Sequence, residues 1–572
     1  MKTVGASVIA IAASFLLILG FNFIGTQTPQ SRIEAVVHEA YDANQLEPLS
    51  NLNNDLFTEC GLFAAELVRD KSVVRDITAS VLPHFTSHPC DTVGFHIAGQ
   101  TLETGTTFRY HYGSRHLFAV LARFMGIEAM RSLIGFLGIA APLALGIAFF
   151  IRVRSEVLAM SPLILTLVVG FGYTNLGRNL AHAPGFVIPL LMLSGVVGCR
   201  SFFVPASRRF AAYASIASIA TYFDILSGPL PFILAVTLIV NHFTFNSGRN
   251  DNCWIRQSAV LCVLFLGASV FIIGLKLALV AIVFQTNPLR DFGRELTIRM
   301  SSVNDSLASI TRGQLILQLW GSRALSFLGS LPAASLFYIS GALCWGLSAI
   351  LLAARRGERY REVSVLAMGS LVVLLWYMIF LNHSYVHHQF MARIGVLPAA
   401  AGIMALVVLS NGWLAIAGVA IVPIVGVIAL QTLSLVPQIS EVQLEPDALR
   451  ADFVSCSNEL TLRRDGKPDI VWRIALDGSR FFRTRLSGIR IYRINPAGVF
   501  STNPGSFPAA ILSTDGNLLS HADRTINVAI GRRKELLIAF CDDGGATPQT
   551  RFNITAFSSQ GESSTTIALH GK

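Results

Sequence analysis

Long apolar runs separated by short polar turns fill the chain from residue 1 to about 436. Three of these runs, 4–24, 129–151 and 258–284, are each at least as long as the roughly 20 residues that a helix needs to cross a bilayer. Window length and hydropathy together predict about 11 transmembrane helices over this stretch. The pattern is typical of a polytopic α-helical membrane protein.

The short polar turns indicate how the chain is oriented. Arginines such as Arg152, Arg154 and Arg200 gather in alternate turns, and positive charge in short loops marks the cytoplasmic side. No clear small-residue cleavage site follows the first apolar run, so we expect an uncleaved first span with a cytoplasmic N-terminus. The long segments 25–112 and 285–329 then lie outside. A multi-pass protein of a bacterial inner (plasma) membrane is the simplest expectation.

The pattern changes after about residue 436. Apolar and polar residues alternate in 470–474, 489–493 and 536–541, and turn signals such as Asp477-Gly478 and Asn495-Pro496 separate these runs. Many short strands with regular turns predict an all-β, sandwich-like domain over 437–572. An odd number of spans places this domain on the periplasmic or extracellular side. The sequence therefore predicts two domains, 1–436 and 437–572.

Composition supports a membrane protein and removes several function classes. Of the 572 residues 52% are hydrophobic and 14% are charged, whereas an ordinary soluble domain has about 25% charged residues. The formal net charge of +10 does not indicate nucleic acid, because many basic residues fall in short loops that the positive-inside rule explains. The chain has no P-loop, dinucleotide fingerprint, nucleophile elbow or Cys-x-x-Cys motif.

The eight cysteines divide according to the predicted topology. Cys60 and Cys90 fall in the first outer segment, and Cys456 and Cys541 fall in the C-terminal domain. An even number of cysteines in each region on the oxidising side is what disulfides would give. We expect the pairs Cys60–Cys90 and Cys456–Cys541, and no disulfide among the other four cysteines.

The first outer segment carries the most suggestive acidic residues. A helix over 53–60 would place Asp55 and Glu59 four residues apart on one face, with Glu66 near the same line. Carboxylates at this spacing repel each other, which raises a pKa or favours a cation or basic ligand. The alternative is a solvated helix face, which is the common outcome for a single acidic pair.

Two groups of basic residues could hold a phosphate. Lys276 lies well inside a long apolar run, where a charge is costly and is usually paired or functional, unless it extends to the membrane surface. His383, His387 and Arg393 lie in a polar stretch between two spans, and imidazoles with an arginine suit a phosphate or pyrophosphate. His383 and His387 could instead bind a divalent metal, although no third ligand is evident, and an ordinary interfacial loop is the other alternative.

Two further positions are candidates for a substrate pocket. Asp224 stands between two short spans, where an acid is either functional or caps a helix or pairs with an arginine. Arg109, Tyr110 and His111 close the first outer segment and could face a sugar or a lipid head group. An aromatic belt at the interface is an equally good interpretation of these three residues.

The layout resembles the GT-C superfamily of membrane glycosyltransferases. The resemblance lies in a first span, a long outer loop with acidic residues, a short amphipathic helix expected on the membrane surface, many further spans and a soluble outer domain. It covers roughly residues 1–436. The local residue patterns of 109–124, 223–229 and 383–393 are also similar to those of the family. In that family an Asp or Glu of the first outer loop activates the acceptor, which implies Asp55 or Glu59 here.

The resemblance implies a function and a role in it for several of these residues. We expect transfer of a sugar from a polyprenyl-phosphate-linked donor to a glycan, lipid or protein acceptor at the outer face. Lys276, His387 and Arg393 would hold the departing phosphate. No cofactor would be required and a divalent metal would be optional. The C-terminal domain would bind glycan or position the acceptor. The alternatives are a membrane O-acyltransferase acting on a surface glycan and a glycan or lipid transporter.

Overall fold

The structure is a computed structural model. It describes residues 2–42, 55–83, 89–100, 103–107, 113–172, 179–223, 228–246, 253–300, 332–354, 359–380, 388–410, 414–422, 438–444, 470–477, 484–486, 488–494, 510–514, 518–521, 528–530, 533–540, 551–558 and 561–568. The chain forms two compact units. The first consists of Met1–Glu39, Ala65–Pro83 and Thr104–Val427, and the second consists of Ala40–Ala64, His84–Glu103 and Ile428–Lys572.

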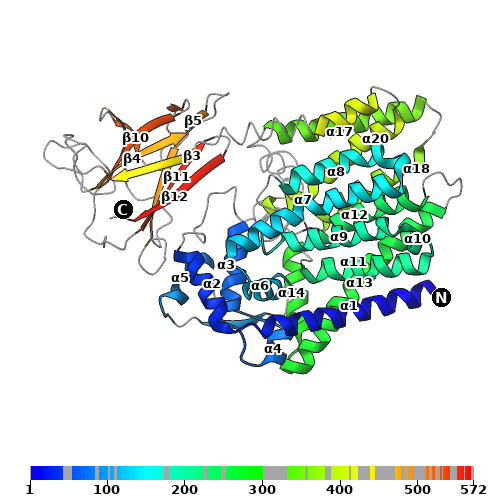
Figure 1. The fold of residues 1–572 in the computed structure, drawn as a ribbon, viewed down its shortest axis with the longest axis horizontal. Helices are drawn as coiled ribbons and strands as arrows, with labels where there is room; N and C mark the ends of the chain where they lie inside the picture. Colours follow the sequence, from blue (N-terminus) through cyan, green and yellow to red (C-terminus); the bar gives the residue numbers. More distant parts are fainter. Residues whose placement is uncertain are drawn as a thin grey trace. The chain divides into compact units, whose positions relative to one another are not determined.

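Helices make up most of the first unit (Figure 1). In chain order the helices and short strands of residues 2–410 are α1 (Lys2–Thr26), α2 (Gln30–Asp42), α3 (Asp55–Leu67), α4 (Val73–Thr78), β1 (Ser80–Pro83), α5 (Pro89–Ile97), β2 (Thr104–Thr107), α6 (Gly113–Ala122), α7 (Ile127–Arg152), η2 (Arg154–Glu156), α8 (Val157–Gly172), α9 (Ala183–Gly198), α10 (Arg200–Phe203), α11 (Ala206–Phe223), α12 (Pro229–Asn241), η4 (His242–Asn246), α13 (Cys253–Phe284), α14 (Pro288–Met300), α17 (Pro332–Ala354), α18 (Tyr360–Ile379) and α20 (His388–Leu409). Of these, α5 belongs to the second unit, and α2 and α3 each extend into both.

Five of the described helices are long and apolar enough to cross a membrane. They are Lys2–Thr26, Ile127–Arg152, Pro229–Asn246, Trp254–Phe284 and Tyr360–Ile379. Shorter apolar helices occur at Ala183–Gly198, Ser340–Ala354 and Ile394–Leu409. The structure therefore supports a helical membrane protein, and the count of about 11 spans stays a prediction.

The helices pack side by side around a buried centre. Helix α1 lies against α11, which in turn lies against α13, and α7 lies against α8 and α9 (Figure 1). Every residue of α12 is buried. A helix that is apolar on all sides belongs in the interior of a bundle, and the composition of α12 fits that position.

The segment expected to be a polar outer loop, 25–112, is largely helical in its described parts. It contains α2, α3, α4 and α5, and the strands β1 and β2, which pair antiparallel. Helix α6, expected to lie on the membrane surface, is instead buried over most of its length, including Arg115, His116 and Phe118. The interpretation of α6 as a surface helix is therefore wrong, because its amphipathic pattern reflects packing against protein.

The described part of the C-terminal region is all strand. The strands are β3 (Gln438–Leu444), β4 (Ile470–Asp477), β5 (Thr484–Leu486), β6 (Gly488–Ile494), β7 (Ala510–Ser513), β8 (Leu518–His521), β9 (Val528–Ile530), β10 (Arg533–Phe540), β11 (Arg551–Ser558) and β12 (Gly561–Ala568). They form sheets of order β3-β4-β10-β7-β8, β12-β11-β6 and β5-β9, with antiparallel pairing. Strands β4, β6 and β10 confirm the alternating runs seen in the sequence, and the sandwich arrangement stays a prediction.

Candidate functional site

A network of buried charges joins three segments of the first unit. Arg115 of α6 is 1% exposed, and its Nε lies 2.9 Å from Oε1 of Glu66, at the end of α3. Its Nη2 donates to Oδ1 of Asp76 in α4 over 2.5 Å and to the Asp76 backbone carbonyl over 3.1 Å. Both carboxylates are also buried. One guanidinium therefore bridges two acidic groups that lie ten residues apart in sequence.

A second arginine ties this network to the end of α1. Arg69 pairs with Glu66 and also donates to the backbone carbonyls of Thr28 and Gly25, over 3.1 and 3.4 Å. The last carbonyl groups of a helix have no partner within the helix, and a guanidinium there satisfies them and opposes the helix dipole. Arg69 therefore holds the segment after α3 against the C-terminal end of α1.

The protonation of Glu66 depends on its burial and on the two arginines beside it. Burial raises the pKa of the Glu66 carboxyl above its usual value, while Arg115 and Arg69 act in the opposite direction. Because Glu66 accepts a hydrogen bond from Arg69 and forms an ion pair with Arg115, its ionised form is the one that this geometry stabilises. A buried charge that lost one of these partners would be left uncompensated.

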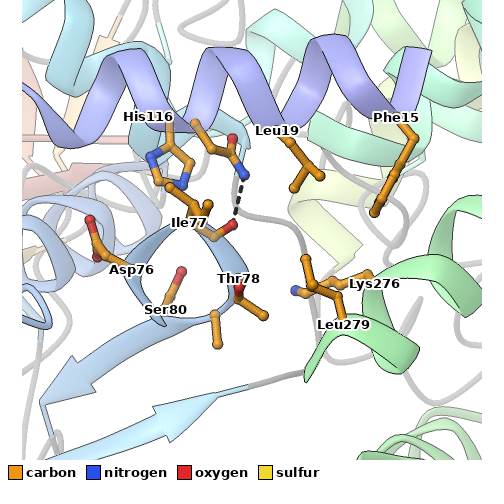
Figure 2. Close-up of a pocket in the computed structure, with 11 residues that line it drawn as sticks. Phe15, Leu19, Asp76, Ile77, Thr78, Ser80, His116, Lys276 and Leu279 are labelled. Carbon is orange, nitrogen blue, oxygen red and sulfur yellow. Dashed lines mark hydrogen bonds between the residues drawn. The ribbon is translucent and has the colours of Figure 1, made fainter. Parts of the chain in front are cut away.

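A small pocket opens beside this network, where the C-terminal ends of α1 and α13 meet α4 (Figure 2). Its enclosed space is about that needed for one water molecule, and one side is open. We call it the α1–α13 pocket. Its polar lining comes from five elements, α1, α4, β1, α6 and α13, and the residues are Asn22, Asp76, Thr78, Ser80, His116 and Lys276. Phe15, Leu19, Ile77, Ala79 and Leu279 complete the wall.

Lys276 is the charged group that the membrane-crossing part of the chain contributes to this pocket. It lies on α13 eight residues before the helix ends, and it is 5% exposed. Figure 2 shows its amino group directed toward the space between α13 and α4. The structure therefore favours a pocket position for Lys276 over the alternative in which it extends to the membrane surface.

The wall beside Lys276 is held by hydrogen bonds from α1 and α11. Asn22 of α1 donates from Nδ2 to the carbonyl of Ile77 over 3.0 Å, the bond drawn in Figure 2. Tyr222, at the end of α11, donates from its hydroxyl to Oδ1 of Asn22. Gly113 fits against this tyrosine, because a Cβ at that position would come within 2.5 Å of the ring. These contacts fix α4 and its Asp76 relative to α1.

His116 completes the pocket as a neutral base. Burial lowers the pKa of its imidazole well below 6.5, and the positive charges of Arg115, Arg69 and Lys276 lower it further. Its Nδ1 is buried and has no hydrogen-bond partner among the described residues. A Cβ at Gly25 would approach this side chain to 3.0 Å, so only glycine fits there without a shift.

The predicted acidic helix forms, and its Glu59 and Glu66 are buried, while the side chain of Asp55 lies outside the description. Asp55 and Glu59 lie on α3, whose first residues belong to the second unit. Glu59 is 3% exposed, so the alternative of a solvated helix face is wrong for it, as it is for Glu66. Asp55 and Glu59 belong to the second unit and Lys276 belongs to the first. Because each unit is described by itself, the predicted meeting of these residues stays a prediction.

Most of the other predicted site residues lie outside the described parts of the chain. These are Arg109, Tyr110, His111, Asp224, His383 and His387, and for Arg393 the structure describes only the backbone, in α20. Within the described residues, no group of three or more His, Cys, Asp or Glu side chains could hold a metal ion.

The cysteines follow the expected division where they are described. Cys60 is buried and disulfide-bonded, whereas Cys199, Cys262 and Cys344 are free. The side chain of Cys90 on α5 lies outside the description, as do Cys456 and Cys541. The pairings Cys60–Cys90 and Cys456–Cys541 therefore stay predictions.

Sequence reasoning missed four residues of the pocket and of the charge network beside it: Asn22, Asp76, Arg115 and His116. A signal was present for three of them, because Asn22 interrupts the first apolar span, and Arg115 and His116 precede the apolar run of α6. Polar residues in such runs are usually paired or functional. Asp76 gave no such signal, since it lies in a polar segment like many other acids.

Comparisons of the chain with protein-family models, with curated proteins and with solved structures found no match. The site is therefore interpreted from its own geometry.

Proposed function

We propose that this protein transfers a sugar from a polyprenyl-phosphate-linked donor to an acceptor hydroxyl at the outer membrane surface, and that the α1–α13 pocket binds the donor phosphate. The observation that carries the proposal is the position of Lys276, a nearly buried lysine on an apolar helix that lines one pocket with Asp76 and His116. An ionisable residue at membrane depth is by default a functional candidate.

The charge of the cluster supports an anionic ligand. Lys276 lines the pocket with Asp76 and His116, and Arg115 and Arg69 lie in the network beside it. A lipid-linked sugar phosphodiester carries one negative charge and would accept hydrogen bonds from the Lys276 ammonium group. Nδ1 of His116 offers a further hydrogen-bonding atom.

The proposed reaction needs a base and a phosphate site close together. The acceptor oxygen attacks the anomeric carbon of the sugar, and the bond between that carbon and the phosphate oxygen breaks. The phosphate leaves with the bonding electron pair, and a carboxylate takes the acceptor proton. Lys276 stabilises the second negative charge that develops on the phosphate. The step therefore requires no cofactor.

Asp76 is the carboxylate that lines the pocket with Lys276, and we assign it the role of base in place of Asp55 or Glu59. Arg115 holds Asp76 Oδ1 and the Asp76 carbonyl, which fixes the orientation of the carboxylate. A base held in one orientation needs little rearrangement at the moment of reaction.

The test uses the full-length protein in nanodiscs with a panel of polyprenyl-phosphate sugars and a membrane lipid extract as acceptor. We expect release of polyprenyl phosphate, and a loss of about 100-fold in Lys276→Met. Lys71→Met, at an exposed lysine, is the matched control and should retain activity. Absence of release from every donor, or full activity in Lys276→Met, contradicts the proposal.

The assignment of the base is tested in the same assay. We expect Asp76→Asn to lower kcat by a factor of about 100 to 10,000, the range for loss of a general base, while the exposed Asp291→Asn control does not. Thermal unfolding of each variant separates loss of activity from loss of folding. Full activity in Asp76→Asn together with loss in Glu59→Gln would return the role to Glu59.

A further inference from the structure

The chain changes direction where α13 ends. The helix ends at Phe284, and Gln285 follows with a φ of 51°, in the left-handed region that ends helices. Asn287 Oδ1 then accepts the backbone N–H of Leu289 over 3.2 Å, and Pro288 begins α14. Proline in the first turn has no N–H that would be left without a partner. The start of α14 is thus set at the end of a membrane-crossing helix.

Helix α14 carries an apolar stripe along one side. Leu289, Phe292, Leu296 and Met300 follow the spacing i, i+3, i+7 and i+11, which places them in one row on an α-helix. Leu289 is 65% exposed and Met300 is 42% exposed, and the other two are partly exposed. Asp291, which is exposed, lies on the opposite side of the helix.

Basic residues lie on the polar side of the helix. Arg290 and Arg294, one turn apart, are both exposed and are turned away from the apolar row, as Asp291 is. The whole helix contains three arginines against one aspartate and one glutamate. An apolar row on one side with arginines on the polar side is the pattern of a helix that lies in the plane of a membrane surface.

We infer that α14 is a lipid-binding element that lies at the bilayer surface, with its apolar stripe among the acyl chains and Arg290 and Arg294 on anionic head groups. The adjoining part of α13 supports a lipid environment, because Ile282 in its last turn is 74% exposed on a helix apolar enough to cross the membrane. The stripe of α14 therefore follows directly, along the chain, on a helix with exposed apolar side chains. This inference does not depend on the sugar-transfer proposal.

A second copy of the chain fits the stripe less well than a membrane does. A stable protein interface buries about 1,200–2,000 Å² in total, and four side chains on a helix of 13 residues supply only part of such an area.

The depth of the stripe is tested with the full-length protein in nanodiscs. A fluorescent amino acid is introduced at position 289, 300 or, as the control on the polar side, 291. With lipids brominated on their acyl chains, we expect at least twofold stronger quenching at 289 and 300 than at 291. Equal quenching at all three positions overturns the inference, and so does cross-linking between two copies through the stripe.

The head-group contact is tested by hydrogen exchange of α14 in nanodiscs with and without phosphatidylglycerol. We expect exchange to be slower by roughly tenfold with the anionic lipid, because Arg290 and Arg294 are attracted to a negative membrane surface. The variant Arg290→Gln/Arg294→Gln should lose this difference. Exchange that is independent of lipid charge in the unmodified protein overturns the role of the arginines.

Discussion

Arg115 is the residue on which the buried charges of the first unit depend. It contacts Glu66 and Asp76, and through Glu66 it is coupled to Arg69 at the end of α1. A buried ion pair contributes little net stability compared with an apolar replacement of the whole group, but removal of one partner leaves the others uncompensated. The network therefore specifies how α3, α4 and α6 assemble on α1.

We predict that Arg115→Met destabilises the protein by about 3–5 kcal/mol, because two buried carboxylates lose their shared partner. Arg115→Lys should recover part of this loss, since one ammonium group cannot reproduce the forked contact. Thermal unfolding in detergent measures the effect, and Arg154→Met, at an exposed arginine, serves as the control. Equal melting temperatures for the two methionine variants would show that the network is not important for stability.

His116 makes stability depend on pH. Its pKa in the folded protein lies well below 6.5, so the unfolded chain takes up a proton first as the pH falls. Stability from the neutral imidazole is complete above about pH 6.5 and decreases as the pH falls from there toward the folded pKa. Arg115, Arg69 and Lys276 are the charged groups that oppose protonation.

We predict that His116→Gln flattens the decrease in melting temperature between pH 7.5 and pH 5, because the variant has no imidazole to protonate at this site. The comparison of the two curves isolates this histidine from the other twelve. Parallel curves for the two proteins would show that His116 is not held in its neutral form.

Close helix packing depends on glycine at several contacts between elements. In α17 and α20, a Cβ at Gly402 would meet the carbonyl oxygen of Gly341, and one at Gly341 would come within 2.6 Å of the Ala399 Cα. Trp345 Nε1 donates to the carbonyl of Pro398 across the same interface, over 3.0 Å. Small residues that allow two backbones to approach are a common device for joining helices in membranes.

We predict that Gly402→Ala destabilises the protein by about 1–3 kcal/mol, the usual cost of added volume at a tight contact. Gly346→Ala on α17 is a matched control, since a Cβ there meets nothing within 4 Å, and it should be neutral or slightly stabilising. Thermal unfolding of the two variants checks the pair. A loss of stability in Gly346→Ala as large as that in Gly402→Ala would contradict this explanation.

The helices and strands were more predictable from the sequence than the contacts between them. Long apolar runs predicted α1, α7 and α13, and alternation predicted β4, because both patterns are local. The contacts of Asn22 with Ile77 and of Arg115 with Asp76 join residues 55 and 39 positions apart. No local pattern encodes such pairings, so Lys276 was recognised from its apolar surroundings while Asp76 was not.

At the scale of the whole molecule, one arrangement connects these findings. The C-terminal ends of α1 and α13 meet α4 at one pocket, and α14 follows α13 directly. The pocket contains Lys276, Asp76 and His116 at the end of two helices that are apolar enough to cross a membrane. The proposed function places a lipid-anchored donor phosphate at this position.

The most direct test of the central claim is the position of the donor phosphate. An electron cryomicroscopy structure of the protein in nanodiscs, with a non-cleavable phosphonate analogue of a polyprenyl-phosphate sugar, would show it. We predict phosphonate density within hydrogen-bond distance of Lys276 Nζ, beside Asp76 and His116. Density bound at another place while the α1–α13 pocket stays empty would contradict the account.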